Sequence, residues 1–158
     1  ITVEMITYTI GIATTKDNII LIRKTKPAWQ AGKFNYVGGK VEGSESAQKC
    51  IAREFEEETS IKTTPESWKY LGMMQRENDF VCYVLAQENE EFVNCKTTTE
   101  EQVVIWSKID FIRYFQKYPE DFMSNLLWMY DYSRCRDFDE YKCTFDIIFP
   151  ENTSHELK

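Results

Sequence analysis

Residues 38–61 read GGKVEGSESAQKCIAREFEEETSI, and this stretch decides what the chain can be. Two serines, Ser44 and Ser46, are suitable N-caps, so a helix is expected over residues 46–58. Apolar residues recur every four positions after the cap, which predicts one buried side. They are Ala47, Ile51 and Phe55.

Three carboxylates share another face of this helix. Glu54, Glu57 and Glu58 are spaced i, i+3 and i+4, whereas Glu56 points elsewhere and is expected only to be solvated. Like charges at i, i+4 destabilise a helix by about 0.2–0.5 kcal/mol, and a bound divalent cation would remove that repulsion. Clustered carboxylate oxygens suit Mg²⁺, or Mn²⁺ in its place. An acidic, solvated helix face is the alternative interpretation.

The residues before the helix favour the metal interpretation. Gly38 and Gly39 permit positive φ and a close backbone approach, so they could present a carbonyl to a metal or amides to a phosphate. Lys40 offers a positive charge to a phosphate oxygen. Arg53 could pair with Glu57 at i+4 or reach back to Glu45. Together these parts fit a metal-assisted phosphoanhydride hydrolase.

This stretch resembles the Nudix box, G-x5-E-x7-R-E-U-x-E-E-x-G-U, in which U is a bulky apolar residue. The match begins at Gly39 and ends at Ile61, and eight of nine fixed positions agree. The departure is Ser60, which stands where the family has Gly. That Gly ends the helix in the left-handed region, so we expect Ser60 to affect stability by about a kcal/mol and to leave the metal site intact.

The resemblance implies a fold and a mechanism. The fold would be α/β (α+β), a Nudix-type α/β/α sandwich with a mixed β-sheet. Water would attack a phosphorus of a nucleoside diphosphate derivative, with divalent cations neutralising the phosphates. By carry-over, the metal would be held by Glu54, Glu57, Glu58 and the Gly38 carbonyl, and Glu45 and Arg53 would orient the glutamates.

The general base is left open by the sequence. In some relatives it is a box glutamate, here Glu57 or Glu54, and in others it is a glutamate from a distant loop. Glu100 and Glu101 lie just before a predicted strand, where MutT-type relatives carry such a residue. A plain acidic loop is the alternative for this pair.

The substrate is suggested by weaker similarities. Residues 32–42 are similar to sanitising enzymes that hydrolyse oxidised purine nucleoside triphosphates, and Asn35 matches the Asn that reads the base there. Residues 118–121, Tyr-Pro-Glu-Asp, resemble their Trp-Pro-Asp-Asp, which places Glu120 and Asp121 at the purine edge. A polar helix start is the alternative for these two acids. Stacking candidates are Trp29, the least core-like, and Phe34, Tyr36 and Trp128.

The rest of the chain indicates a single domain over residues 1–158. Strands are expected at 5–13, 18–23, 35–37, 68–75, 79–87, 103–106 and 144–149. A loop is expected at 25–34, with helices at 109–117 and 121–130. The region 131–158 could close over the substrate, join an oligomer or complete the core. Strands, a helix, more strands and then helices indicate α+β or a mixed sandwich.

Composition narrows the partners and the compartment. The net charge of −7 gives no general attraction to nucleic acid or an anionic membrane, so neither is expected as a partner. Five cysteines without a CxxC pair favour free thiols in a reducing compartment, and the start lacks signal-peptide features, so we expect a cytoplasmic protein. The single His155 lies four residues from the C-terminus, a poor place for catalysis.

Two classes of function stay open. The first is an enzyme whose small nucleotide-type substrate is a triphosphate, or else ADP-ribose, NADH or a dinucleoside polyphosphate. The second is a sensor that keeps the fold and binds nucleotide without turnover. About 40 residues precede the box. They leave no room for an N-terminal dimerisation domain, which favours a compact monomer over a homodimer.

Overall fold

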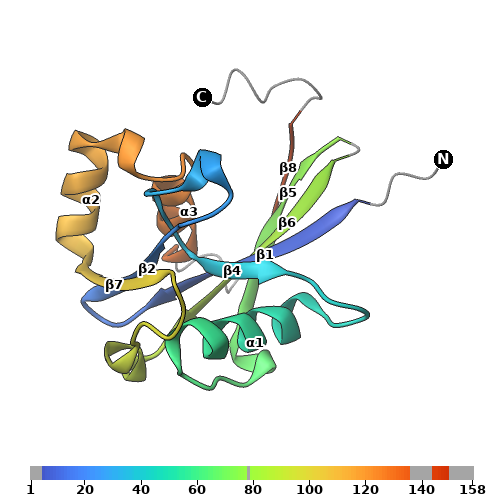
Figure 1. Ribbon diagram of the computed structural model, residues 1–158, viewed down its shortest axis with the longest axis horizontal. Helices are drawn as coiled ribbons and strands as arrows, with labels where there is room; N and C mark the ends of the chain where they lie inside the picture. The colour runs from blue at the N-terminus through green and yellow to red at the C-terminus, as the bar shows by residue number, and fades with distance from the viewer. Residues whose placement is uncertain (1–4, 78, 136–143, 150–158) are drawn as a thin grey trace.

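The central pairing of the fold joins two long strands that are far apart in sequence. In the computed structural model, which describes residues 5–77, 79–135 and 144–149, β1 (Ile6–Thr14) lies parallel to β6 (Phe80–Glu88). Their register runs from Ile6↔Phe80 to Thr14↔Glu88. Figure 1 shows these strands crossing the middle of the molecule.

The remaining strands extend this pair into one eight-stranded mixed sheet. The order is β3-β2-β1-β6-β5-β8, with β4 also paired to β1 and β7 also paired to β2. The β5–β8 pair is parallel and the other added pairs are antiparallel. These strands are β2 (Asn18–Arg23), β3 (Phe34–Asn35), β4 (Val37–Lys40), β5 (Lys69–Arg76), β7 (Gln102–Ser107) and β8 (Phe145–Phe149).

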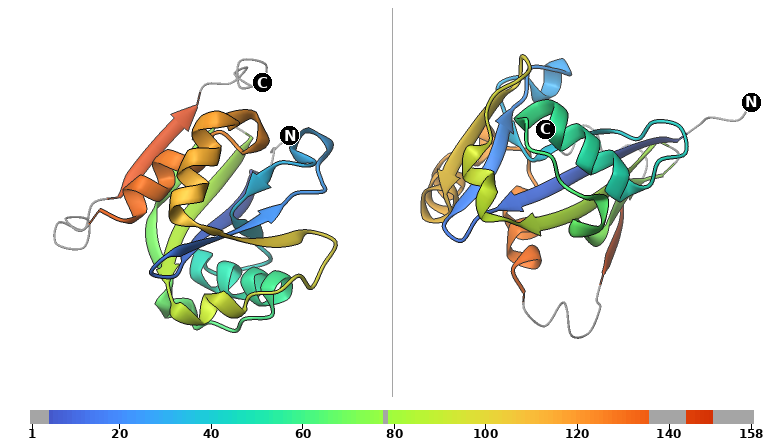
Figure 2. Two further views of the ribbon diagram at one scale, coloured as in Figure 1. Left: turned by 90° about the vertical axis from the view of Figure 1, so that its left-hand side faces the viewer. Right: turned by 90° about the horizontal axis from the view of Figure 1, so that it is seen from below.

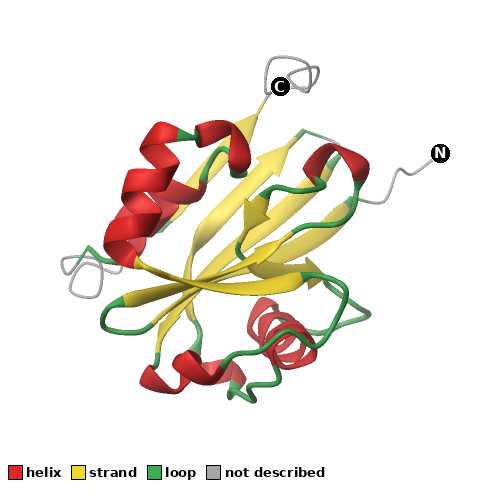
Figure 3. Ribbon diagram, turned by 60° about the vertical axis from the view of Figure 1, so that its left-hand side comes forward, coloured by secondary structure: helices red, strands yellow, loops and turns green. Residues whose placement is uncertain are grey.

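Helices cover both faces of the sheet. On one face α1 (Ala47–Thr59) packs Ile51 and Phe55 against the sheet, with Trp68 and Phe92 beside them. On the other face lie α2 (Lys108–Lys117) and α3 (Leu126–Ser133), whose apolar residues form a second core. Figures 2 and 3 show α1 separated from α2 and α3 by the sheet. The expected α/β/α sandwich is therefore confirmed.

Most of the elements expected from sequence are present within one or two residues of the expected bounds. The single strand expected at 35–37 is wrong, because β3 ends at Asn35 and β4 begins at Val37. The predicted start of one helix is wrong, because α3 begins at Leu126 and not at residue 121. Pro119–Asp121 form a 3-10 turn, after which Phe122 is extended. The backbone there is captured by β3, since the Met123 N–H donates to the Phe34 carbonyl at 2.9 Å. A strand-like bridge thus replaces the first turn of the expected helix.

Other expectations fall partly outside the described residues. Region 131–158 supplies the end of α3 and all of β8, which adds a strand to the sheet beside β5, while His155 and Cys143 lie outside. In the described part, the cysteines are free, as expected: Cys50, Cys82, Cys95 and Cys135. Short 3-10 segments occur at Ala28–Gln30, inside the expected loop, at Pro65–Ser67 and at Glu90–Asn94. Among the described residues, no helix is long and apolar enough to span a membrane.

The end of α1 carries the only positive-φ side chain among the described residues. Ser46 caps the start, accepting a hydrogen bond from the Lys49 N–H at 3.2 Å. Ser60 ends the helix with φ 68° and ψ 1°, and its N–H donates to the Glu56 carbonyl. A non-glycine residue in this region is strained by about 1–2 kcal/mol. The sequence expectation for Ser60 is thus confirmed in its backbone geometry.

We predict that Ser60→Gly stabilises the protein by about 0.5–1 kcal/mol. Relief of the left-handed strain exceeds the added chain entropy of glycine in the unfolded state. Urea denaturation midpoints measure the difference. Ser44→Gly is the matched control, because Ser44 is exposed and has no positive φ, so glycine there should only destabilise. Equal effects of the two changes would contradict the prediction.

Candidate active site

Two glycines in β4 allow this strand to lie very close to β1 on one side and to helix α1 on the other. A Cβ at Gly38 would collide with the Thr9 carbonyl oxygen, and one at Gly39 would collide with the Glu54 carboxylate. Neither glycine adopts the positive φ that glycine permits, whereas the close backbone approach that it also permits is present. The absence of a side chain lets Glu54 lie directly against the β4 backbone.

Arg53 joins the loop before α1 to the carboxylates on it. Its Nε and Nη2 donate to the two oxygens of Glu45 at 3.2 and 2.7 Å, and Nη1 donates to Glu54 at 2.9 Å. Nη2 also donates to the Lys40 carbonyl at 3.1 Å, and Nη1 lies 3.5 Å from Glu57. Both pairings expected from sequence, with Glu45 and with Glu57, are present at once.

These contacts separate the charge states of two neighbouring glutamates. Hydrogen bonds from Arg53 hold the pKa of Glu45 at about 2, and Glu45 in turn raises the pKa of Arg53. Burial raises the pKa of Glu54, and its bond to Arg53 opposes that rise. The site therefore contains one firmly ionised carboxylate, Glu45, which holds Arg53 in place beside Glu54.

Glu58 is a half-buried member of the carboxylate cluster. Its Oε2 is buried and has no hydrogen-bond partner. Burial, together with the nearby carboxylates of Glu101 and Glu54, raises the pKa of Glu58 to about 8. Glu101 is itself buried, and Lys24 Nζ pairs with it at 3.1 Å. Glu101, a loop residue 43 positions after Glu58, thus joins the α1 carboxylates. The distance between the two residues in the sequence gives no indication of this contact.

The donor set fits a divalent metal. An unpartnered buried carboxylate oxygen beside other carboxylates is a group that a cation would satisfy. In the described part of the chain, no three acidic, cysteine or histidine side chains already converge as a cage, because Glu54 and Glu57 face Arg53. The oxygen donors suit a hard cation, and Arg53 and Lys24 contribute positive charge at Glu54 and Glu101.

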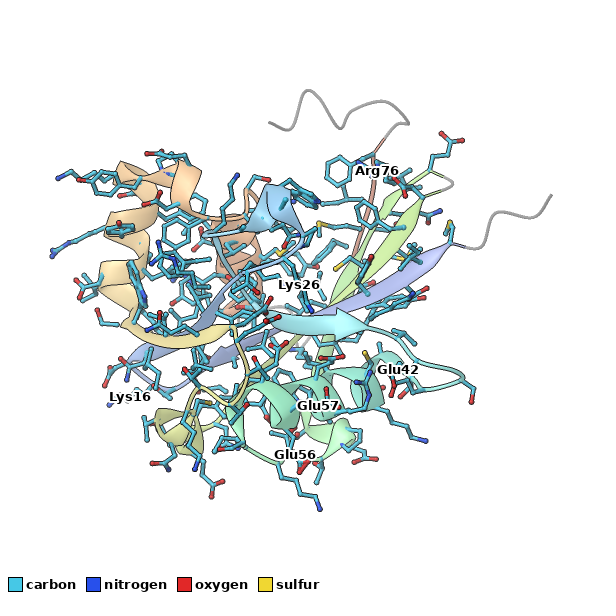
Figure 4. All side chains as sticks on the ribbon, viewed as in Figure 1. Lys16, Lys26, Glu42, Glu56, Glu57 and Arg76 are labelled. Atoms are coloured by element: carbon cyan, nitrogen blue, oxygen red, sulfur yellow. The ribbon has the colours of Figure 1, made fainter. Side chains whose placement is uncertain are left out.

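Four charged residues around the site have exposed side chains: Glu56, Glu57, Glu100 and Lys40. Glu57 has a side chain 55% exposed, while Glu56 is also exposed but points away from the sheet, as expected (Figure 4). Glu100 is exposed and pairs with Lys26 at 3.4 Å, so it lies outside the buried cluster that Glu101 enters. Lys40 has an exposed side chain and gives its carbonyl to Arg53.

The expected substrate pocket is brought together only in part. Phe34 bridges Phe122, so the backbone around Asn35 lies beside the segment containing Glu120 and Asp121. Asn35 is half-buried, and its side-chain oxygen accepts from the Tyr36 N–H at 2.8 Å. Asp121 accepts a hydrogen bond from the Tyr114 hydroxyl at 3.1 Å, while Glu120 is exposed.

The stacking candidates are sorted by burial. Trp29 is 66% exposed and free to meet a ligand. Phe34 and Tyr36 are buried, and the Tyr36 hydroxyl donates to the Leu126 carbonyl, so both are core residues and not platforms. Trp128 packs edge-on against Phe145. The stacking expectations for Phe34 and Tyr36 are therefore wrong, because both side chains lie in the core, whereas Trp128 is only half-buried.

A surface groove of about 550 Å³ lies apart from the carboxylates. It runs between β7 and α2, and Trp106, Arg113 and Tyr118 are among its lining residues. None of its lining residues belongs to the carboxylate cluster. No pattern in the sequence predicts this groove.

Sequence reasoning also missed Lys24. It follows β2 directly, and a single lysine at a strand end carries no distinctive pattern. The only available signal was its place beside a loop that is rich in functional candidates. Its pairing with Glu101 depends on β2 and β7 being neighbours in the sheet.

The NUDIX domain profile matches residues 5–126, which is most of the chain. The chain belongs to the Nudix family. It is a Nudix hydrolase, and the carboxylate helix described above is the Nudix helix. A CTP pyrophosphohydrolase from Escherichia coli K12 is 29% identical over 104 residues, which cover 65% of this chain and 76% of that protein.

Solved structures agree on the fold. A NUDIX hydrolase from Nitrosomonas europaea has a TM-score of 0.62 at 13% identity, covering 94% of this chain and 80% of that one. MutT of Aliivibrio salmonicida and Vibrio cholerae has a TM-score of 0.58 at 19% identity, covering 80% and 94%. A MutT/nudix family protein from Enterococcus faecalis has a TM-score of 0.59 at 17% identity, covering 66% of this chain but only 44% of that protein.

We predict that Glu45→Gln lowers the free energy of unfolding by about 1.5–3 kcal/mol at neutral pH, because charge-assisted bonds to Arg53 are lost. The folded pKa of about 2 lies below the ordinary value of 4.5, so this stabilisation is present above pH 4.5 and disappears as the pH falls toward 2. Denaturation of both proteins between pH 7 and 2 measures it.

Glu42→Gln provides the control for this prediction. Glu42 lies 3.8 Å from the same arginine, but its side chain is 72% exposed. It should change stability by less than about 0.5 kcal/mol at any pH. A difference between wild type and Glu45→Gln that did not depend on pH would contradict the assignment.

Proposed function

We propose that this Nudix hydrolase cleaves a nucleoside triphosphate to a monophosphate and pyrophosphate in the presence of Mg²⁺. The observation that carries the proposal is the carboxylate cluster on α1, with an unpartnered buried oxygen on Glu58. Mn²⁺ is the expected substitute, since both ions prefer oxygen ligands. The 29% identity to a CTP pyrophosphohydrolase supports a triphosphate substrate.

The proposed metal ligands are Glu54, Glu57, Glu58 and the Gly38 carbonyl. When bound, the metal would neutralise phosphate charge and lower the pKa of a water molecule. The role of Arg53 in this scheme is to hold Glu54 while Glu45 holds Arg53. The backbone at Gly39 keeps the carboxylate of Glu54 against β4, and Lys40, with its exposed side chain, would contact a phosphate.

Glu57 is the proposed general base. Its side chain is the most solvent-accessible of the three clustered carboxylates on α1, so it can receive a proton from an attacking water. Glu54 accepts a hydrogen bond from Arg53 at 2.9 Å and Glu101 pairs with Lys24 at 3.1 Å, whereas Glu57 lies 3.5 Å from Arg53 and is the more available acceptor. The alternative is that Glu54 or Glu101 takes this role once its partner has moved.

The proposed base-recognition residues are Asn35, Glu120, Asp121 and the exposed Trp29. The Tyr114 hydroxyl bond to Asp121 fixes that carboxyl as an acceptor. Asn35 and the 120–121 segment are adjacent through the Phe34–Phe122 bridge, which supports a shared pocket. Oxidised purine triphosphates and CTP are the first substrates to compare. ADP-ribose, NADH and dinucleoside polyphosphates are the alternatives within the family.

We predict that Glu57→Gln reduces turnover at least about 100-fold, because the amide cannot accept the proton of the attacking water. Glu56→Gln is the matched control, one position away on α1 and exposed, and it should keep wild-type activity. Products from a nucleotide panel with MgCl₂ are identified by mass. Equal activity of Glu57→Gln and wild type would refute Glu57 as base, and nucleotide binding without any turnover by wild type would favour a sensor.

We predict that Asn35→Ala raises KM for the preferred triphosphate more than it lowers kcat, since base contacts persist from ground state to transition state. The expected increase is about tenfold, the effect of one lost hydrogen bond to a buried polar edge. Initial rates over a substrate series measure it. Asn94→Ala, in the 3-10 segment on the far face, should leave KM unchanged. An unchanged KM for Asn35→Ala would remove this residue from the pocket.

A further inference from the structure

A lysine is embedded in the carboxylate cluster. Lys24 Nζ lies 3.1 and 3.3 Å from the two oxygens of Glu101, and the two side chains are only 18% and 7% exposed. The Lys24 backbone is fixed on both sides, because its N–H donates to the Lys33 carbonyl and its carbonyl accepts from the Gly32 N–H, each at 2.8 Å. The Lys24 side chain therefore extends from a fixed stretch of backbone, and its ammonium group reaches Glu101.

This ammonium group pairs with Glu101, and its charge also acts on Glu58. Glu101 comes from the loop before β7, and Glu58, Glu54 and Glu57 come from α1. The charges of Glu101, Glu54 and Glu57 disfavour ionisation of Glu58, whereas that of Lys24 favours it. Arg53 neutralises the opposite end of the cluster, at Glu45 and Glu54. Lys24 thus provides the positive charge near Glu58, whose Oε2 atom has no hydrogen-bond partner.

We propose that Lys24 is a resident counter-cation that stabilises the carboxylate cluster without metal and weakens the binding of a divalent cation to it. The inference rests on the proposed function in one respect, that this cluster binds such a cation. A positive charge within a few ångströms of a dication raises the free energy of the bound state. The same charge relieves repulsion among Glu58 and Glu101 when no dication is bound.

The proposal separates Lys24 from an ordinary structural ion pair. Breaking a buried pair destabilises a protein whatever its role. If Lys24 is a counter-cation, its removal should lower the stability of the protein but raise its affinity for the metal. The metal would then meet the full negative charge of the carboxylates. Lys24→Met should therefore be less stable in EDTA and should bind Mn²⁺ more tightly than wild type.

The experiment titrates the full-length chain with Mn²⁺ alone, without nucleotide, by calorimetry, and measures urea midpoints in EDTA. For Lys24→Met we expect a lower midpoint and an Mn²⁺ affinity about tenfold higher, within the usual range of coupling between two sites. Lys24→Arg keeps the charge and should behave as wild type. Lys26→Met is the matched control: its pair with Glu100 is 78% and 62% exposed, so Mn²⁺ affinity should not change.

A second pair of variants keeps the test valid if Lys24→Met does not fold. Glu101→Gln with Lys24→Met replaces the buried ion pair by two neutral groups, which is often tolerated. This double variant should bind Mn²⁺ several times more tightly than Glu101→Gln alone, because Lys24 still repels the metal in the single variant. Equal affinities would overturn the proposal.

The outcomes distinguish this proposal from the proposed function. Hydrolysis by wild type, together with unchanged Mn²⁺ affinity in Lys24→Met, would overturn the counter-cation role and leave the enzyme assignment standing. Tighter Mn²⁺ binding by Lys24→Met would support the role of Lys24 even if no triphosphate in the panel were hydrolysed. Failure of every variant and of wild type to bind Mn²⁺ would overturn both the metal assignment and this proposal.

Discussion

The site depends on one guanidinium group. Arg53 bonds two oxygens of Glu45, one of Glu54 and the carbonyl of Lys40, so it ties the β4–α1 loop, strand β4 and helix α1 to one point. Arginine suits this position because its planar donors match a carboxylate in pairs. Without that group, the carboxylates of α1 would repel one another beside a backbone that has no side chains to hold them apart.

Carboxylates are crowded here at a cost in folding free energy. Glu54, Glu57, Glu58 and Glu101 come from two segments, and burial already disfavours charge on Glu54 and Glu58. The chain offsets this crowding with two cationic side chains, Arg53 beside Glu54 and Lys24 beside Glu101. The carboxylate oxygens between these two side chains suit a hard cation, while the two positive charges reduce the negative charge that such a cation would meet.

The sheet that carries these groups also explains where sequence reasoning failed. Phe34 and Tyr36 are aromatic residues next to a candidate substrate residue, and only their burial under α3 identifies them as core. The expected helix at residue 121 fails because β3 captures the backbone at Met123, a contact between segments almost 90 residues apart. The left-handed Ser60, in contrast, was predicted locally, because it stands where the box has the glycine that ends the helix.

The sequence by itself determined the α1 helix, its N-cap at Ser46, its buried side and the shared face of its carboxylates, because these depend on spacing within a few residues. It also determined the family, since the fixed positions of the box lie in one continuous stretch. The tertiary structure alone decided that Glu101 and Lys24 enter the cluster, while Glu100 and Lys26 stay at the surface. The physical reason is that strand pairing between β2 and β7 sets which neighbouring residue faces the interior, and no local pattern records that pairing.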